Sequence, residues 1–190
     1  MDKLLLILGV SGVGKSSIIK ELLALDSKFI YIIPFTTRPS RGTEDTKISI
    51  SNEAMDGRWH RGELLSVNEI YGIRCGTPRS SITQALEQEK IPVLDWPFAY
   101  IEVMELAFPN QLCVVYILPL SIEALRQRLS KDKRDADGHR LRSAQEELGA
   151  YESSRYTGVC DFEIIAEENQ VPKIAHAIYA NYLQFLRQQP

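Results

Sequence analysis

A glycine-rich segment near the start of the chain constrains its fold more than any other feature. Residues 9–16 read Gly-Val-Ser-Gly-Val-Gly-Lys-Ser and match the pattern G-x-x-x-x-G-K-[ST] in full. An unbroken apolar run, Leu4–Leu8, precedes the segment, and Lys15–Leu25 repeats apolar residues at helical spacing. This order predicts a buried strand, a phosphate-binding loop and a helix.

The residue types of this loop suit an anionic phosphate. Its glycines let backbone N–H groups turn inward, and the following helix presents its positive dipole end to the same point. We expect Lys15 to reach the β- and γ-phosphates of a nucleotide and the Ser16 hydroxyl to bind Mg²⁺. An incidental glycine turn is the alternative, but the strand before the loop and the helix after it argue against that interpretation.

Apolar and amphipathic segments alternate along the rest of the chain. The expected core strands are 4–8, 29–35, 91–95, 112–118 and 162–166, and the expected helices are 15–25, 80–88, 122–129, 139–153 and 172–186. Ser121 is a candidate N-cap for the helix at 122–129. Residues 36–62 carry little periodic apolar signal and are expected to form loops, short strands and a short helix near 51–57, and residues 63–70 are expected to form a strand. The alternation predicts an α/β fold with a parallel sheet that helices cover on both faces.

Length and charge exclude several classes of protein. The chain has 190 residues, which suits one domain, and 22 Lys+Arg against 25 Asp+Glu, which argues against a dedicated nucleic-acid binder. The three cysteines are widely spaced and form neither a metal-binding nor a disulfide pattern, which indicates a reducing compartment. We expect a cytoplasmic protein without a signal peptide or membrane span.

A second candidate phosphate site follows the expected second strand. Thr36-Thr37-Arg38-Pro39-Ser40-Arg41 lies at the carboxyl edge of the sheet, where open α/β folds bind ligands. Two arginines with adjacent hydroxyls suit the phosphate of a second substrate. A solvated loop with two surface arginines is the alternative interpretation.

Taken together, these motifs resemble the guanylate kinases, in the nucleoside-monophosphate kinase group of P-loop proteins. The resemblance runs from about residue 4 to residue 183. The matching segments are 9–17, Thr36-Thr37-Arg38-Pro39 with Arg41 and Glu44, Gly76-Thr77, Leu94-Asp95, Ile117-Leu118-Pro119, Arg140-Leu141 and Glu146-Glu147-Leu148. It implies a P-loop NTPase-type sheet in one domain of three parts. These are an ATP-binding core (1–35, 91–129 and 139–190), a GMP-binding insertion (36–90) and a lid (130–138).

The resemblance also implies roles for individual residues. Lys15 and Arg140 are expected to be catalytic, together with a lid cation that we assign to Arg134, with Lys131 and Lys133 as alternatives. The implied ATP and Mg²⁺ site comprises Gly9, Ser11, Gly12, Val13, Gly14, Lys15, Ser16 and Ser17, with Asp95 as a second residue near the metal. The implied acceptor site comprises Arg38, Arg41, Thr77, Asp95 and Arg74.

The positions that recognise guanine depart from the family. Guanine N1–H and N2–H₂ are donors that the family meets with carboxylates and hydroxyls, but those two acids fall at Ser66 and Pro97 here. A serine before the Thr-Thr-Arg motif is replaced within Pro34-Phe35, a tyrosine pair by Arg74-Cys75, and a phosphate-contacting tyrosine by Ile48. Thr77 is retained, and Glu69 lies nearby. Trp96, Phe98 and Tyr100 either stack against a base or pack beside the sheet.

Three functions fit these residues. The first is an ATP-dependent kinase for GMP, dGMP or a related small phosphorylated acceptor, including a non-guanine nucleotide or a sugar phosphate. The second is a non-catalytic guanylate-kinase-like binding module, against which the intact Lys15 and Ser16 argue. The third is an NTPase without an acceptor, which leaves Arg38 and Arg41 without a role. Neither a nucleic-acid polymer nor a membrane is expected as a partner, and the chain is expected to be a monomer or homodimer.

Overall fold

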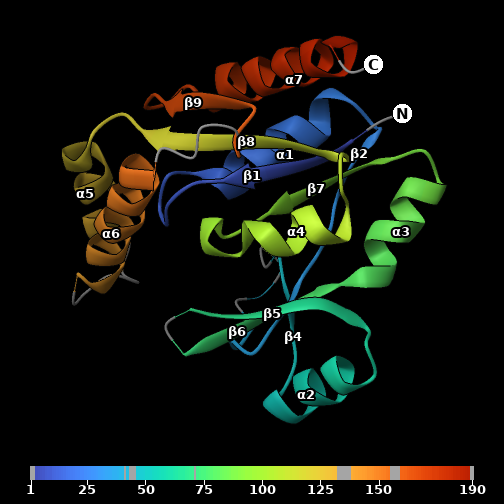
Figure 1. Ribbon diagram of the computed structural model, residues 1–190. Helices are drawn as coiled ribbons and strands as arrows, with labels where there is room; N and C mark the ends of the chain where they lie inside the picture. Colours follow the sequence, from blue (N-terminus) through green and yellow to red (C-terminus); the bar gives the residue numbers. More distant parts are fainter. Residues whose placement is uncertain are drawn as a thin grey trace.

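Five parallel strands form the main sheet of the protein, in the order β2-β7-β1-β8-β9 (Figure 1). The computed structural model describes residues 3–40, 42, 46–70, 72–131, 138–154 and 159–188. The five strands are β1 (Leu4–Leu8), β2 (Phe29–Tyr31), β7 (Ile91–Asp95), β8 (Leu112–Pro119) and β9 (Phe162–Ala166). The predicted parallel sheet is therefore confirmed.

The centre of this sheet is occupied by its most apolar strand. All five residues of β1 are fully buried, because β7 and β8 flank the strand and helices cover both of its faces. The continuous run of leucine and isoleucine is what a strand buried on two sides requires. This position directs the carboxyl end of β1, and the glycine loop after it, to the middle of one sheet edge.

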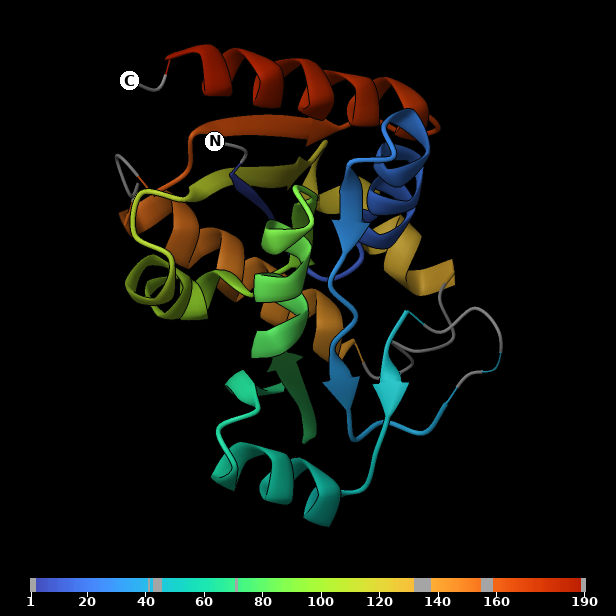
Figure 2. The ribbon, with the colours of Figure 1, turned by 90° about the vertical axis from the view of Figure 1, so that its right-hand side faces the viewer.

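Helices lie on both faces of the main sheet (Figures 1 and 2). They are α1 (Lys15–Leu25), α3 (Arg79–Glu87), the short η1 (Phe98–Tyr100), α4 (Ile101–Ala107), α5 (Ile122–Lys131), α6 (His139–Ser154) and α7 (Val171–Gln188). Helices α1 and α7 pack against each other on one face, while α3 and α4 lie on the other. Ser121 caps α5 as predicted, since its Oγ accepts from the Ala124 N–H at 3.0 Å.

A second, four-stranded sheet lies beside the main one, in the order β4-β3-β6-β5 (Figure 2). Its strands are β3 (Phe35–Thr36), β4 (Ile48–Ser49), β5 (Leu64–Ile70) and β6 (Ile73–Pro78). The expected single strand at 29–35 is wrong, because it divides between the two sheets. Ile32 still donates to the Val93 carbonyl of the main sheet, but Pro34 has no N–H to continue that ladder, and Phe35 pairs with Gly76.

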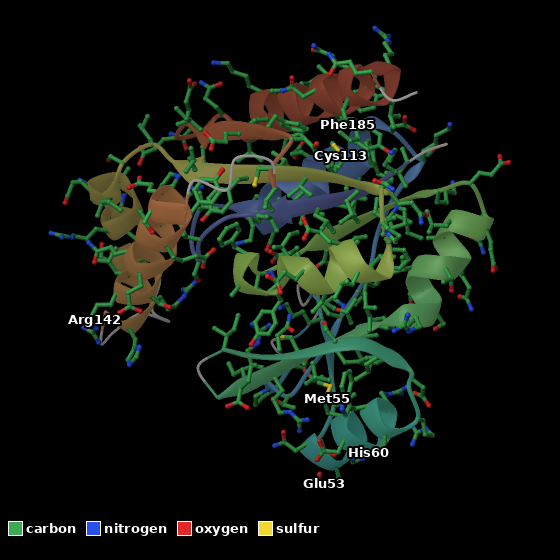
Figure 3. All side chains as sticks on the ribbon, viewed as in Figure 1. Glu53, Met55, His60, Cys113, Arg142 and Phe185 are labelled. Carbon is green, nitrogen blue, oxygen red and sulfur yellow. The ribbon has the colours of Figure 1, made fainter. Side chains whose placement is uncertain are left out.

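Helix α2 (Asn52–His60) covers the outer face of the second sheet. Its N-terminus is capped by Ser51, whose Oγ accepts from the Ala54 N–H at 3.2 Å. Met55 is fully buried and points from α2 toward β5 and β6 (Figure 3). The opposite face of the sheet is thereby left to face the main sheet.

Some elements were not expected from the sequence. Strand β6 and helix α4 are additional, β4 is one of the short strands expected within residues 36–62, and β1, α1, β7 and β9 have the predicted bounds. Strand β6 was missed because polar Arg74, Cys75 and Thr77 interrupt any apolar alternation. Within the described part of the chain, the helices lack the combination of length and apolar character that crossing a bilayer demands.

Candidate active site

The glycine loop after β1 is shaped by two close approaches. A Cβ on Gly9, which has φ +137°, would lie 2.6 Å from the Ile117 carbonyl oxygen of the neighbouring strand β8. A Cβ on Gly12, with φ +88°, would lie 2.6 Å from Leu129 Cδ2 on α5. Only glycine meets both the backbone angle and the space at these positions. The loop is therefore held tightly against β8 and α5, ahead of the N-terminus of α1.

Lys15 lies in the middle of this loop. Its ammonium donates to the carbonyl oxygens of Gly9 and, at 3.2 Å, Val10, and it lies 3.6 Å from Asp95 Oδ1 at the carboxyl end of β7. Ser16 and Ser17 follow at the exposed start of α1. The structure thus brings the predicted Lys15, Ser16 and Asp95 to one edge of the main sheet.

Two arginines contact the loop from helices α5 and α6. Arg140, on α6, donates to Ser11 Oγ from Nε at 3.1 Å and from Nη2 at 2.8 Å. Arg128, on α5, donates from Nη1 to the Val13 carbonyl at 2.9 Å, and its guanidinium lies against Gly14. Arg140 was predicted. Arg128 was missed, although its position on the helix that follows β8 was a signal for it.

Several predicted cations are placed differently or not described. Arg41, Lys133 and Arg134 lie outside the described residues. Lys131 ends α5 with an exposed side chain. Arg38 is half-buried after β3, where Ser49 Oγ donates to its carbonyl at 2.8 Å. Arg74 points to the α2 side of the second sheet, where its Nη2 donates to Asp56 Oδ1 at 2.6 Å.

A cavity of about 620 Å³ lies between the glycine loop and the second sheet. The loop contributes Gly9, Ser11 and Lys15, and Asp95 borders the same end. The second sheet contributes Asn68, Glu69, Cys75 and Thr77. The remaining lining residues come from Pro34, Lys47 and Ile70, from the segment 96–100 after β7, and from Ser143, Glu146, Glu147 and Ala150 on α6.

The face of the second sheet toward this cavity is polar. Thr36, Ser66, Asn68 and Thr77 are the buried polar residues of the described chain, and all four belong to this sheet. The antiparallel register pairs Ser66 with Thr77 and Asn68 with Cys75, and Thr36 also pairs with Cys75. Directly paired residues share a face, so these side chains form one surface.

Lys47 is a cation that sequence reasoning missed. Its Nζ lies 3.4 Å from Cys75 Sγ and it lines the cavity, whereas Ile48, to which the tyrosine position had been aligned, is 47% exposed and is not part of the lining. A shift of one residue in a strand reverses the face to which a side chain points. The segment before β4 is shorter here than in the family, so the family's tyrosine position could not be aligned to a single residue, and it was assigned to Ile48 instead of Lys47.

The aromatic residues after β7 are packed into the protein. Trp96 is 2% exposed, and its Nε1 donates to the Tyr100 carbonyl at 2.9 Å. Phe98 packs edge-on against Tyr116 and Tyr151. Both therefore serve as a rigid apolar wall of the cavity, with little of their ring surface available for stacking.

Glu147 is a half-buried acid that lines the cavity. Burial raises its pKa above the usual range for glutamate, and the neighbouring Asp95 charge acts in the same direction. The Lys15 ammonium and the Tyr116 hydroxyl partly oppose the shift. This carboxyl therefore belongs electrostatically to the same group as Lys15 and Asp95.

The oxygen atoms near the loop suit a hard divalent cation with few protein ligands. Mg²⁺ commonly takes one or two protein oxygens and completes its shell with water and substrate phosphate. The Ser16 hydroxyl and the Asp95 carboxylate are donors of that kind. In the described ranges there is no group of three or more His, Cys, Asp or Glu arranged to hold a metal by themselves.

Comparison with known proteins gives a consistent result across the whole chain. The family model described as guanylate kinase matches residues 1–184. Guanylate kinase from Nostoc sp. is 32% identical over 154 residues, which cover 78% of this chain and 77% of that protein. Guanylate kinase from Polaromonas sp. is 32% identical over 186 residues, which cover 94% and 87% respectively.

Solved structures share the fold. The crystal structure of guanylate kinase from Anaplasma phagocytophilum aligns with a TM-score of 0.75 at 19% identity, covering 99% of this chain and 87% of that one. Shikimate kinase from Acinetobacter baumannii aligns with a TM-score of 0.54 at 15% identity, covering 100% and 97%. Because the family model matches residues 1–184 of the 190-residue chain, the chain belongs to the guanylate kinase family.

Proposed function

We propose that the protein is an ATP-dependent kinase that transfers the γ-phosphoryl group of ATP to GMP, to dGMP or to a closely related phosphorylated acceptor. The observation that carries this proposal is the position of one cavity between two surfaces, the glycine loop and the second sheet. A nucleotide on the loop and an acceptor against the sheet would direct their phosphates toward each other. Family membership supports the same reaction.

The donor side is assigned to the loop. The backbone of residues 9–17 and the dipole of α1 would bind the ATP phosphates, and Lys15 would neutralise the β- and γ-phosphates. Ser16 and Asp95 would hold Mg²⁺, which supplies charge neutralisation when bound. Arg140, which already contacts Ser11, would meet the transferring phosphoryl group. Arg134 would act from the lid, as the resemblance implies.

The acceptor side is assigned to the second sheet and the segment after β3. Arg38 and Arg41 would bind the acceptor phosphate, and Thr77, which lines the cavity, would contact the base. Arg74 is left out, because its guanidinium is paired with Asp56 on the other face of the sheet. Lys47 takes its place as the cation of the second sheet region that lines the cavity.

Catalysis of this kind depends on position and charge. Phosphoryl transfer requires two anions held in line and the developing charge neutralised, with water excluded. We therefore propose that the chain is divided into a core, an acceptor-binding insertion at 36–90 and a lid at 130–138 that closes over the phosphates.

We also propose a cytoplasmic location, which the three free thiols support.

A different acceptor is the second candidate. The two acid positions of the family's guanine site hold Ser66 and Pro97, so a non-guanine nucleotide or a sugar phosphate remains an alternative substrate. A non-catalytic module is less well supported, because the loop geometry, Lys15 and Arg140 are intact.

An acceptor panel tests the proposal. ADP formation is measured with ATP–Mg²⁺ and each of GMP, dGMP, AMP, CMP, UMP and ribose 5-phosphate. The proposal expects turnover that requires an acceptor and is fastest with a guanine nucleotide. Turnover without any acceptor would identify an NTPase, and no turnover at all would overturn the kinase assignment.

Arg38→Ala tests the acceptor side separately. Loss of a guanidinium that binds phosphate predicts a fall of roughly tenfold to a hundredfold in kcat/KM for the acceptor, with the KM for ATP little changed. Arg187→Ala, an exposed arginine of α7, is the matched control. Unchanged acceptor kinetics in Arg38→Ala would show that Arg38 has no such role.

A further inference from the structure

One hydroxyl of the glycine loop is bonded to helix α6. Arg140 donates to Ser11 Oγ from two nitrogens, Nε at 3.1 Å and Nη2 at 2.8 Å, although 129 positions of sequence separate the two residues. A hydroxyl oxygen has two lone pairs, so it accepts both bonds. One edge of the guanidinium is thereby fixed relative to the loop.

The Ser11 hydroxyl lies where the donor and acceptor sides meet. Ser11 and Lys15 line the cavity from the loop. Ser143, one turn of α6 after Arg140, lines the same cavity from the helix. A guanidinium that is held on Ser11 is therefore placed at the part of the loop that borders the cavity.

Helix α6 is anchored to the core independently of this contact. Leu148 is buried, and Tyr151 stacks on Tyr116 of β8 with the ring centroids 3.8 Å apart. The Tyr151 hydroxyl also donates to Glu163 Oε1 of β9 at 2.5 Å. The contact with the loop is therefore not what holds the helix in place. It fixes the direction of one long, flexible side chain.

We propose that Ser11 is a positioning residue, whose hydroxyl orients the Arg140 guanidinium toward the γ-phosphoryl group of ATP. This inference rests on the proposed function. A charge that is oriented in advance needs no reorganisation when negative charge develops on the transferring group. A neutral hydroxyl suits this task, because a carboxylate in its place would neutralise the guanidinium that has to meet a phosphate.

Direct binding of ATP is the competing explanation for the same hydroxyl. A hydroxyl also has one proton to donate, and a phosphate oxygen is a suitable acceptor for it. Direct binding by Ser11 would lower the KM for ATP and would not depend on Arg140. Positioning would raise kcat, and its effect would disappear when Arg140 is removed.

A double-mutant cycle separates the two explanations. We would measure kcat and the KM for ATP in Ser11→Ala, in Arg140→Ala and in the double variant, with the acceptor that gives the fastest turnover in the panel. Ser11→Ala is expected to lower kcat roughly tenfold, with a KM for ATP within about threefold of that of the unaltered protein. The double variant is expected to be no slower than Arg140→Ala alone. Ser11→Thr, which keeps the hydroxyl, should have a kcat within about threefold of the unaltered value.

Two matched controls make the result specific. Ser153→Ala and Arg142→Ala, at exposed positions of α6, should leave both kinetic constants unchanged. Losses in kcat that multiply in the double variant would overturn the inference. So would a raised KM for ATP with an unchanged kcat in Ser11→Ala, or a Ser11→Thr variant as slow as Ser11→Ala. If the unaltered protein phosphorylates no acceptor in the panel, the proposed function itself is refuted, and this inference with it.

Discussion

At the scale of single residues, the site depends on one lysine placed where three oxygens meet. The Lys15 ammonium contacts two loop carbonyls and lies near Asp95, so it is already oriented in the protein alone. A fixed charge of this kind costs no reorganisation when substrate charge develops beside it. The side chain is therefore expected to matter for the rate of transfer far more than for folding.

Substitution of Lys15 tests this view. Lys15→Met keeps the length of the side chain but removes the charge, and kcat is expected to fall roughly a hundredfold or more while the thermal midpoint changes little. Lys20→Met, an exposed position on the same helix, controls for loss of a lysine from α1. Steady-state kinetics and circular dichroism measure the two effects, and near-normal turnover in Lys15→Met would contradict the assignment.

The half-buried carboxyl of Glu147 gives a prediction about pH. Because its pKa is raised in the folded protein, the folded state binds this proton more tightly than the unfolded chain does. That contribution to stability is present at acidic pH and is lost as pH rises through the raised pKa. Glu147→Gln, which cannot ionise, should therefore gain stability relative to the unaltered protein as pH increases from 4 toward 7.

Urea unfolding at several pH values measures this difference. The exposed neighbour Glu146→Gln serves as the control for removing one negative charge from α6. A difference between Glu147→Gln and the unaltered protein that stays constant across this range would show that the carboxyl does not titrate as described.

At the scale of elements, the second sheet is what makes the cavity, and it depends on close packing by α2. A Cβ on Gly76 would lie 2.6 Å from Met55 Sδ and 2.9 Å from Leu64 Cδ1. Met55 is fully buried, and Leu64 is nearly so. The small residue at position 76 lets α2 approach β6 and fixes the sheet whose other face borders the cavity.

Gly76→Ala should therefore destabilise the protein. Overpacking of this kind costs about 1–3 kcal/mol, which corresponds to a fall of roughly 2–12 °C in the thermal midpoint. Gly149→Ala is the matched control, because a Cβ there meets no atom within 4 Å and alanine favours the helix. Calorimetry measures both variants, and equal midpoints for them would contradict this account of the packing.

The elements also show why part of the fold was predictable. β1 and α1 were predicted with correct bounds, because each has a strong period and clear chemical signals at its ends. β6 and the break after Tyr31 were not, because their register is set by partners distant in sequence. The orientations of Arg74 and Lys47 depend on that register, so a resemblance alone could not assign them.

At the scale of the whole molecule, residues from four parts of the fold border one cavity. The glycine loop, the second sheet, the end of β7 with the segment after it, and helix α6 all contribute. The sequence allowed the loop, Asp95 and Arg140 to be predicted as parts of one site, because parallel strands end at a common edge. Lys47, Arg128 and Glu147 became evident only from their surroundings in the folded chain.

The central claim is that this cavity holds ATP and a guanine nucleotide together, so that the γ-phosphoryl group passes directly from one to the other. The most direct test incubates the protein with Mg²⁺, GMP and ATP labelled at the γ-phosphate, and separates the products by chromatography. The account predicts that the label appears in GDP in step with ADP formation, and that Lys15→Met abolishes both. Label appearing as inorganic phosphate at the same rate with or without GMP would contradict it.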